Sequence, residues 1–286
     1  MSLKTSIVTG ATSGLGFATA KALAAKGHEV ILVARSQQKG EIALDKIHQE
    51  SPNAQLHLIT ADLSQQASIR KLATQIEQQF PKIDVLVNNA GIWNTDRIIT
   101  VDGIEEVFAV NHLSYYLLTH LLYPLLRLSK EGRVVNVGSD SHFQWKRINL
   151  DDVSLESKYH GLRSYAQSKL ANLLFTYEFH RLKPDQHIHI NCVQPGLVKT
   201  DIGVKHTNWL HSLAWKIRRS GGVSPEEGAA TQVFLASAPE ASGKSGLYWD
   251  KCKPKSSSEG SYHEEDARQL WAMSCEWCGI SSYFPA

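Results

Sequence analysis

The sequence predicts an α/β fold in which helices cover both faces of one doubly wound parallel sheet of about seven strands. Short runs rich in β-branched residues alternate with longer stretches of helical periodicity along most of the 286-residue chain. A glycine-rich turn separates the first run from the first helical stretch. Hydrophobic residues make up 42% and charged residues 20%, a composition that supports a packed core. We therefore expect a single domain over residues 1–286.

The alternation defines the expected elements in chain order. Buried strands are expected at 5–9, 29–34, 55–61, 84–87, 133–137 and 188–193. Helices are expected at 15–26, 65–80, 103–128, 165–182 and 225–237. Right-handed crossovers would place the ligand site at the carboxyl ends of the strands. Lys, Pro, Ser and Gly cluster at 251–261, which predicts a surface loop.

Charge and cysteine content exclude several classes of protein. The 30 Lys and Arg residues nearly balance the 28 Asp and Glu residues, and no concentrated basic run predicts nucleic-acid binding. Four cysteines are too few for a disulfide framework, which favours a reduced, cytoplasmic protein. The sequence shows no leader pattern and no uncharged apolar stretch of about 18 residues, so neither a signal peptide nor a transmembrane segment is expected.

The turn after the first strand has the pattern G-x-x-x-G-x-G. Glycines let the backbone turn tightly and approach a pyrophosphate, and the N-terminus of the next helix offers free N–H groups to that anion. A glycine-rich turn alone is as often a plain connection, but the strand before it and the helix after it favour dinucleotide binding. The candidate cofactor residues of this turn are Gly10, Thr12, Ser13, Gly14, Leu15 and Gly16.

The end of the second strand indicates which dinucleotide is bound. Sites for NAD(H) often place an acid here to hold the ribose 2′-hydroxyl, but this strand ends in Ala34-Arg35-Ser36. The Arg35 guanidinium can pair with a 2′-phosphate through two charge-assisted hydrogen bonds, and Ser36 can donate another. An exposed arginine is often only a solvated charge, but the missing acid favours NADP(H) as the cofactor.

Short motifs that contain polar residues recur after the later strands and in two helical stretches. These motifs are Asp62-Leu63, Asn89-Ala90-Gly91, Asn111, Ser139 and Tyr165-x-x-x-Lys169. In type, order and strand context these motifs resemble the short-chain dehydrogenase/reductase family over nearly the whole chain. The resemblance implies a Rossmann fold, a nicotinamide cofactor and oxidoreductase chemistry on an alcohol or a carbonyl group.

The proposed chemistry follows from the residue types. Tyr165 and Lys169 are four residues apart in a helical stretch, so their side chains share one face. A nearby ammonium favours the phenolate, so we expect Lys169 to lower the pKa of Tyr165 and make it a usable acid and base. Ser139 would hydrogen-bond the substrate oxygen. Ser141 competes for that role, and only the family pattern favours Ser139.

The resemblance implies further contacts. Asn111 would hold a water that passes on protons from Lys169, which also grips the nicotinamide ribose. The turn Pro195-Gly196 would pass the nicotinamide, with Val198 and Thr200 against the carboxamide or the pyrophosphate. The other cofactor contacts implied by the family are Asp62, Leu63, Asn89, Ala90, Gly91, Tyr165 and Lys169, and no metal is expected.

The substrate region is the variable part of the family. Residues 204–219 carry apolar side chains at helical spacing, and the family places a substrate lid at about 203–222. An apolar lid favours a hydrophobic aldehyde, ketone or alcohol, with His142 lining the pocket beside Ser139 and Tyr165. The C-terminal extension at about 250–286 resembles the retinol dehydrogenase and WW-domain oxidoreductase branch, which makes a retinoid a candidate substrate.

Other interpretations stay open. An NADP(H)-binding redox sensor would keep the fold without the chemistry, and the helix at 204–219 could instead contact a membrane or a partner. The C-x-x-C pair Cys275 and Cys278 would need further ligands for zinc, such as Cys252 and His263, so buried thiols are the simpler interpretation. In the family, helices like those holding Asn111 and Tyr165 often build dimers, which implies a homodimer.

Overall fold

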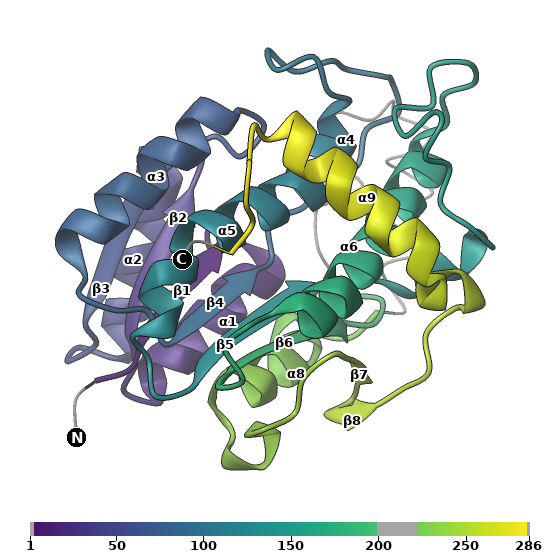
Figure 1. The fold of residues 1–286 in the computed structure, drawn as a ribbon. Helices are drawn as coiled ribbons and strands as arrows, with labels where there is room; N and C mark the ends of the chain where they lie inside the picture. The colour runs from purple at the N-terminus through teal and green to yellow at the C-terminus, as the bar shows by residue number, and fades with distance from the viewer. Residues whose placement is uncertain (1–2, 199–221, 285–286) are drawn as a thin grey trace.

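A twisted eight-stranded sheet forms the centre of the molecule (Figure 1). The computed structural model describes residues 3–198 and 222–284. The strand order is β3-β2-β1-β4-β5-β6-β7-β8, and every pair is parallel except the last. The bounds are β1 Thr5–Thr9, β2 Glu29–Ala34, β3 Leu56–Thr60, β4 Val85–Asn88, β5 Gly132–Val137, β6 Ile188–Gln194, β7 Leu247–Asp250 and β8 Lys253–Pro254. The order reverses between β1 and β4, which is the switch point where such sheets bind ligands.

Helices cover both faces of this sheet, as predicted. Successive strand residues point to opposite faces, so Ile7 of β1 belongs to one hydrophobic cluster and Val8 to the other. The first cluster is covered by α3 (Gln66–Gln79), α5 (Ser114–Arg127) and α6 (Gly161–Leu182). The second is covered by α1 (Gly14–Ala25), α2 (Gln37–Glu50) and α8 (Pro225–Ser237). The doubly wound architecture is therefore confirmed (Figure 1).

One expected helix is interrupted. In place of a continuous helix over 103–128, the chain forms α4 (Glu106–Phe108), a π-helical segment η1 (Ala109–Leu113) and then α5. The carboxylate of Glu105 begins α4 by accepting hydrogen bonds from the N–H groups of Val107 (3.0 Å) and Phe108 (2.9 Å). The π segment contains Asn111, and single π turns inside helices are frequent at functional sites.

The surface loop predicted at 251–261 is found in part, because Lys251, Lys253 and Pro254 are exposed but the second half of the segment is largely internal. This segment contains β8 and the start of the 3₁₀ turn η4 (Glu259–Tyr262), and Ser257, Ser258 and Ser261 are buried. The serine hydroxyls find partners inside the protein, because Ser257 Oγ lies 2.7 Å from the hydroxyl of Tyr177 and 2.6 Å from Ser261 Oγ. A composition typical of loops therefore forms an internal hydrogen-bonded turn here.

The chain ends in a helix that packs across α6. This helix is α9 (Glu264–Trp277), and in Figure 1 it lies over the outer side of α6. Trp271 of α9 and Tyr283 of the tail stack against Phe175 of α6 and Tyr116 of α5. As a result, α6 is buried without a break from 166 to 179, so it is an interior helix.

Among the described residues, no helix is both long and apolar enough to span a bilayer.

Candidate active site

The site begins where β1 and β4 end side by side. The Thr9 hydroxyl accepts hydrogen bonds from the N–H groups of Asn89 (2.9 Å) and Ala90 (3.0 Å), and Asn89 Nδ2 donates to the Thr9 carbonyl (2.8 Å). These bonds tie the two strand ends together at the switch point. The glycine-rich turn therefore leaves β1 from a fixed position beside Asn89, Ala90 and Gly91.

Two positions in this turn require glycine. Gly10 has a φ of +67°, and a Cβ there would lie 3.0 Å from Ala90 Cα. A Cβ on Gly16 would lie 2.3 Å from the Gly10 carbonyl oxygen, so any side chain would separate α1 from the turn. The Ser13 hydroxyl does not cap α1. The first-turn N–H groups, near Thr12, Gly14 and Leu15, therefore have no side-chain cap, which suits them to an anion.

The end of β2 carries the residues that the sequence assigns to the cofactor phosphate. Arg35 follows β2 directly and its side chain is exposed. The Ser36 hydroxyl accepts from the Lys39 N–H (3.4 Å) and so begins α2. After β3, the Asp62 carboxylate accepts from the N–H (3.0 Å) and the hydroxyl (2.7 Å) of Ser64, which shapes the turn.

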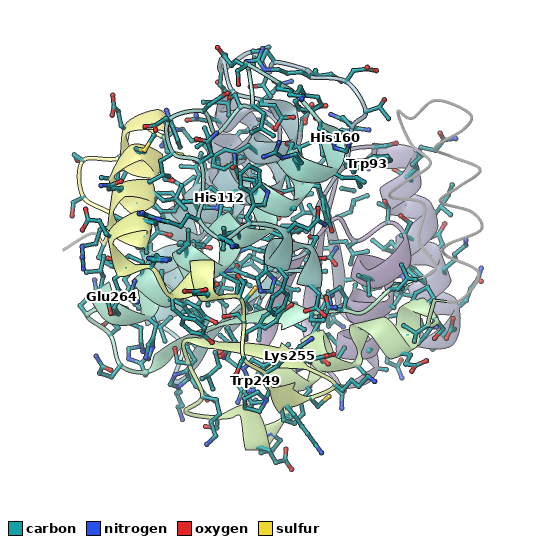
Figure 2. All side chains as sticks on the ribbon, turned by 90° about the vertical axis from the view of Figure 1, so that its right-hand side faces the viewer. Trp93, His112, His160, Trp249, Lys255 and Glu264 are labelled. Carbon is teal, nitrogen blue, oxygen red and sulfur yellow. The ribbon has the colours of Figure 1, made fainter. Side chains whose placement is uncertain are left out.

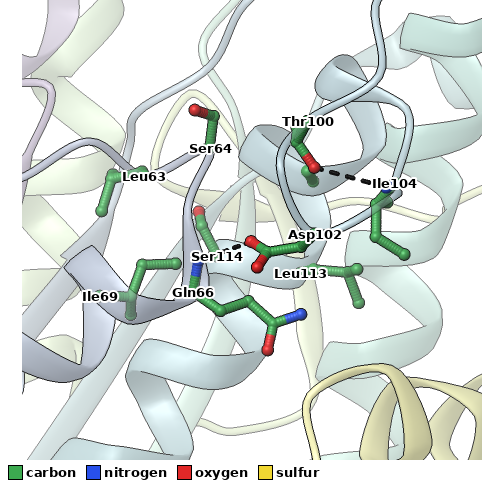
Figure 3. Close-up of a pocket in the computed structure, with 10 residues that line it drawn as sticks. Leu63, Ser64, Gln66, Ile69, Thr100, Asp102, Ile104, Leu113 and Ser114 are labelled. Atoms are coloured by element: carbon green, nitrogen blue, oxygen red, sulfur yellow. Dashed lines mark hydrogen bonds between the residues drawn. The ribbon is translucent and has the colours of Figure 1, made fainter.

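The Leu63 side chain is buried. It lines a cavity of about 10 Å³ under the start of α3, together with Ile69 and Leu113 (Figure 3). Asp102 closes one side of this cavity by accepting from the Gln66 N–H (2.8 Å). A space of this volume holds about one water molecule, so it is not a substrate pocket. The structure therefore gives Leu63 a packing contact.

Asn111 is fixed by the π segment and by the loop after β4. Its Oδ1 accepts from the Ile92 N–H (2.8 Å), and its Nδ2 donates to the Ile92 carbonyl (3.0 Å) and to Ser168 Oγ (3.0 Å). A Cβ on Gly91 would lie 3.5 Å from Asn111 Oδ1 and 3.8 Å from Lys169 Nζ. Gly91, Asn111 and Lys169 therefore meet at one point, as the sequence predicts.

Lys169 is almost completely buried, with 2% of its surface exposed. Its ammonium donates to the Val137 carbonyl at the end of β5 (2.8 Å) and lies 5.5 Å from the ring centre of Tyr165 and 5.6 Å from that of Tyr115. Burial lowers the pKa of Lys169 to about 8. Tyr115, whose hydroxyl donates to the Ala90 carbonyl (2.8 Å), was not among the expected site residues.

The structure brings Ser139 to Tyr165. Burial raises the pKa of Tyr165 to about 12, and a hydrogen bond with the Ser139 side chain acts in the opposite direction. We expected Lys169 to lower this pKa. Its ammonium donates to the Val137 carbonyl while it lies 5.5 Å from the Tyr165 ring centre, and the hydrogen bond with Ser139 is the direct contact that favours the phenolate. Ser141 Oγ is buried without a partner among the described residues, whereas Ser139 Oγ also accepts from the Ser141 N–H (3.2 Å). This geometry favours Ser139 over Ser141.

His142 is fully buried, so the structure does not place it in an open pocket. Its Nδ1–H donates to the Ser139 carbonyl (2.6 Å), and its Nε2 accepts from the Ser258 N–H (3.0 Å). Both ring nitrogens are therefore used inside the protein. We expected His142 to line the substrate pocket, but in the structure it makes an internal contact behind Ser139.

The turn after β6 lies beside the glycine-rich turn. Gly196 has a φ of +79°, and Val198 is buried in a bridge with Val223. A Cβ on Gly228 of α8 would lie 2.6 Å from Val198 Cγ2 and 3.2 Å from the Pro195 carbonyl oxygen, so this helix packs directly on the turn. Thr200 and the expected lid at 203–222, except for residue 222, lie outside the described residues.

Two further residues support the site without having been predicted. Asn172 Nδ2 donates to the Asn111 carbonyl (2.8 Å), and Asn172 Oδ1 lies 3.2 Å from His112 Nδ1. His112 is in the interior and also contacts Ser274 of α9 (3.3 Å, Figure 2). Asn172 is three residues after Lys169, so its place on the same helix face could have revealed it. His112 depends on α9, which the sequence did not predict.

The cysteines of the C-x-x-C pair are packed as thiols. Cys275 Sγ lies 3.0 Å from the Tyr116 hydroxyl, and burial raises the pKa of Cys278 to about 12. Cys252 contacts Thr231 (3.8 Å). Over residues 3–198 and 222–284, no group of three or more potential ligands could hold a metal ion.

Comparisons with known proteins show which family the chain is similar to. The short chain dehydrogenase family matches residues 4–211. Human polyprenol dehydrogenase is 37% identical over 97% of this chain and 86% of its own length, and human retinol dehydrogenase 13 is 36% identical over 98% and 86%. The WW domain-containing oxidoreductase of Pongo abelii is 35% identical over 95% of this chain and 67% of its own length.

Solved structures show the same fold. An uncharacterised protein from Mycobacterium paratuberculosis superimposes with a TM-score of 0.77 at 31% identity, covering 99% of this chain and 95% of its own. A short chain dehydrogenase from Escherichia coli CFT073 complexed with NADPH gives a TM-score of 0.70 at 22% identity, covering 87% and 97%. The chain therefore belongs to the short-chain dehydrogenase family, in the branch of the retinol dehydrogenases and the WW domain oxidoreductase.

Proposed function

We propose that this protein is an NADP(H)-dependent oxidoreductase that interconverts a hydrophobic aldehyde or ketone and the corresponding alcohol. The observation that carries the proposal is the convergence of Ser139, Tyr165, Lys169 and Asn111 at the carboxyl edge of the sheet, next to the glycine-rich turn.

The cofactor side of the site fits a phosphorylated dinucleotide. Gly10 and Gly16 leave the turn bare, and the uncapped start of α1 offers N–H groups to the pyrophosphate. Arg35 is exposed at the edge of β2, where its guanidinium can pair with a 2′-phosphate. A protein of the same fold is solved with NADPH, which supports the same choice.

When bound, the nicotinamide supplies or accepts the hydride. The protein then has to hold the reacting oxygen and move one proton. Ser139 and Tyr165 would hydrogen-bond the substrate oxygen, and Tyr165 would give its phenolic proton to that oxygen during reduction and take it back during oxidation. The ammonium of Lys169, which lies 5.5 Å from the ring centre of Tyr165, would stabilise the phenolate that forms.

The substrate class rests on apolar groups near the site and on the relatives. Phe143 and Leu162 are exposed, one close in sequence after Ser139 and the other one helical turn before Tyr165, and Leu197 is exposed beside Gly196. Large apolar side chains that are exposed close in sequence to the proposed catalytic residues favour an apolar ligand. Relatives named for polyprenol and retinol agree with a long, hydrophobic alcohol or aldehyde.

The proposal is tested by following NADPH oxidation with retinal, a medium-chain aldehyde and an aromatic ketone, and by repeating each assay with NADH. We expect turnover with NADPH, little with NADH, and the highest kcat/KM for the most apolar carbonyl. Tight NADPH binding without turnover of any carbonyl would contradict the proposal and favour a non-catalytic redox sensor.

A further inference from the structure

The turn that carries Ser139 is held from behind by the C-terminal part of the chain. This turn is η2 (Asp140–Gln144), with Ser139 as its first capping residue. The residues that hold it belong to 248–262, which lies beyond the segment 4–211 that matches the family. We call residues 248–262 the C-terminal strap. Its contacts with η2 are polar, and the contact between Ser258 and His142 is buried.

The first contact is a bridge through His142. The imidazole donates from Nδ1 to the Ser139 carbonyl (2.6 Å) and accepts at Nε2 from the Ser258 N–H (3.0 Å), so it joins the catalytic serine to the strap. The ring is completely buried and packs edge-on against Tyr248 with 5.1 Å between ring centres. Only the neutral imidazole with its proton on Nδ1 can make both bonds at once.

A second contact fixes the neighbouring residue. The Asp140 carboxylate accepts hydrogen bonds from the Tyr248 hydroxyl (2.9 Å) and from the Lys255 ammonium (2.8 Å). The Lys255 side chain is 34% exposed and is labelled in Figure 2. The strap is itself anchored to α6, because Ser257 Oγ lies 2.7 Å from the Tyr177 hydroxyl. Asp140 and Lys255 are the charged groups that face His142, and they have opposite signs.

We propose that His142 is a positioning residue. By linking the Ser139 carbonyl to the Ser258 N–H of the strap, it keeps the Ser139 side chain at hydrogen-bond distance from Tyr165. The inference rests on the proposed function, since it deepens the role given there to Ser139. The Ser139 side chain hydrogen-bonds Tyr165, and the same residue's carbonyl is bound by His142. A displacement of about 1 Å in such a group can cost about 100-fold in rate, so the bridge acts on turnover more than on cofactor binding.

Two substitutions at this position separate the bridge from simple packing. His142→Phe keeps an aromatic ring beside Tyr248 but removes both hydrogen bonds, and it leaves the Ser258 N–H without its acceptor. His142→Gln offers an amide oxygen to the Ser258 N–H and an amide N–H to the Ser139 carbonyl, so it can replace both hydrogen bonds. The matched control is Ser258→Ala, because the Ser258 hydroxyl is buried without a partner among the described residues, while its N–H remains in the variant.

The experiment measures three quantities for each variant: kcat and KM, the NADPH dissociation constant, and amide hydrogen exchange of residues 139–145 and 253–262 in the protein without ligands. For His142→Phe we expect kcat to fall about 10- to 100-fold, NADPH affinity to stay within about twofold, and exchange to rise in both segments. His142→Gln should recover most of the kcat, and Ser258→Ala should match the unaltered protein.

Three results would overturn the inference. They are an unchanged kcat in His142→Phe, unchanged exchange in both segments, or a His142→Gln variant as impaired as His142→Phe. If His142→Phe does not fold, Lys255→Met tests the same strap by removing its ion pair with Asp140, and it should raise exchange at 139–145 and lower kcat by a smaller factor. If the unaltered protein turns over no carbonyl, the proposed function fails, but the exchange comparison still decides whether the bridge holds Ser139.

Discussion

At the scale of single residues, burial sets the electrostatics of the site. Burial raises the pKa of Tyr165 to about 12 and lowers that of Lys169 to about 8, because both charged forms lose water. The sequence places these two side chains on one helix face, as found. It could not show that the Lys169 ammonium binds the Val137 carbonyl, since that contact depends on how α6 packs against β5.

The two pKa shifts predict how turnover depends on pH. Reduction uses the proton on Tyr165, which stays bound through the neutral range because its pKa is about 12, while Lys169 loses its charge above about 8. We therefore expect kcat/KM for reduction to be constant from about pH 6 to pH 7.5 and to fall through about pH 8. Measured rates that rise with pH across this range would contradict the assignment of Tyr165 as the acid.

Arg35 is the residue expected to choose between the cofactors. Arg35→Asp replaces a guanidinium that can pair with the 2′-phosphate by an acid that repels it, so NADPH affinity should fall by roughly 10-fold or more while NADH affinity changes little. Fluorescence titration of both cofactors measures this difference. Equal losses of affinity for NADPH and NADH would show that Arg35 does not contact the 2′-phosphate.

At the scale of elements, His112 links the π segment to α9. It is fully buried, and burial lowers its pKa to about 4, below the value of about 6.5 that it has when unfolded. The folded protein therefore resists protonation, so stability present above about pH 6.5 is lost as the pH falls toward 4. The free energy of unfolding, measured in urea at pH 7 and at pH 5, should decrease less in His112→Gln than in the unaltered protein. The exposed His160→Gln should show the same decrease as the unaltered protein. An equal decrease in all three proteins would exclude His112 as the cause.

Physical reasons explain which helices and strands could be predicted from the sequence and which could not. β1 is buried along its whole length, and β2 is a run of five buried apolar residues after Glu29. α8 has a proline and acidic residues in its first turn, so both kinds of element follow from local sequence. In contrast, α2 is mostly polar and buries only Gly40, Ala43 and Ile47. The strand β7 has only four residues, and the π segment in front of α5 arises from contacts of Asn111 with the loop after β4.

At the scale of the whole molecule, the C-terminal region covers the surface of α6 that a dimer interface would need. The family resemblance implied a homodimer through the helices that hold Asn111 and Tyr165. However, α9 and the tail cover that side, and α6 is buried without a break from 166 to 179. We therefore predict that the protein does not dimerise through α6 and is a monomer of 31.8 kDa in sedimentation equilibrium. A dimer that dissociates when α6 residues are substituted would contradict this.

The central claim is that Tyr165 transfers the proton in a hydride-transfer reaction. The most direct test is single-turnover reduction of an apolar aldehyde by NADPH, measured for the unaltered protein and for Tyr165→Phe alongside NADPH titration. We predict that Tyr165→Phe binds NADPH with nearly unaltered affinity and loses turnover by at least about 100-fold, because only the phenolic proton is removed. A Tyr165→Phe variant that still reduces the aldehyde at the original rate would contradict the account.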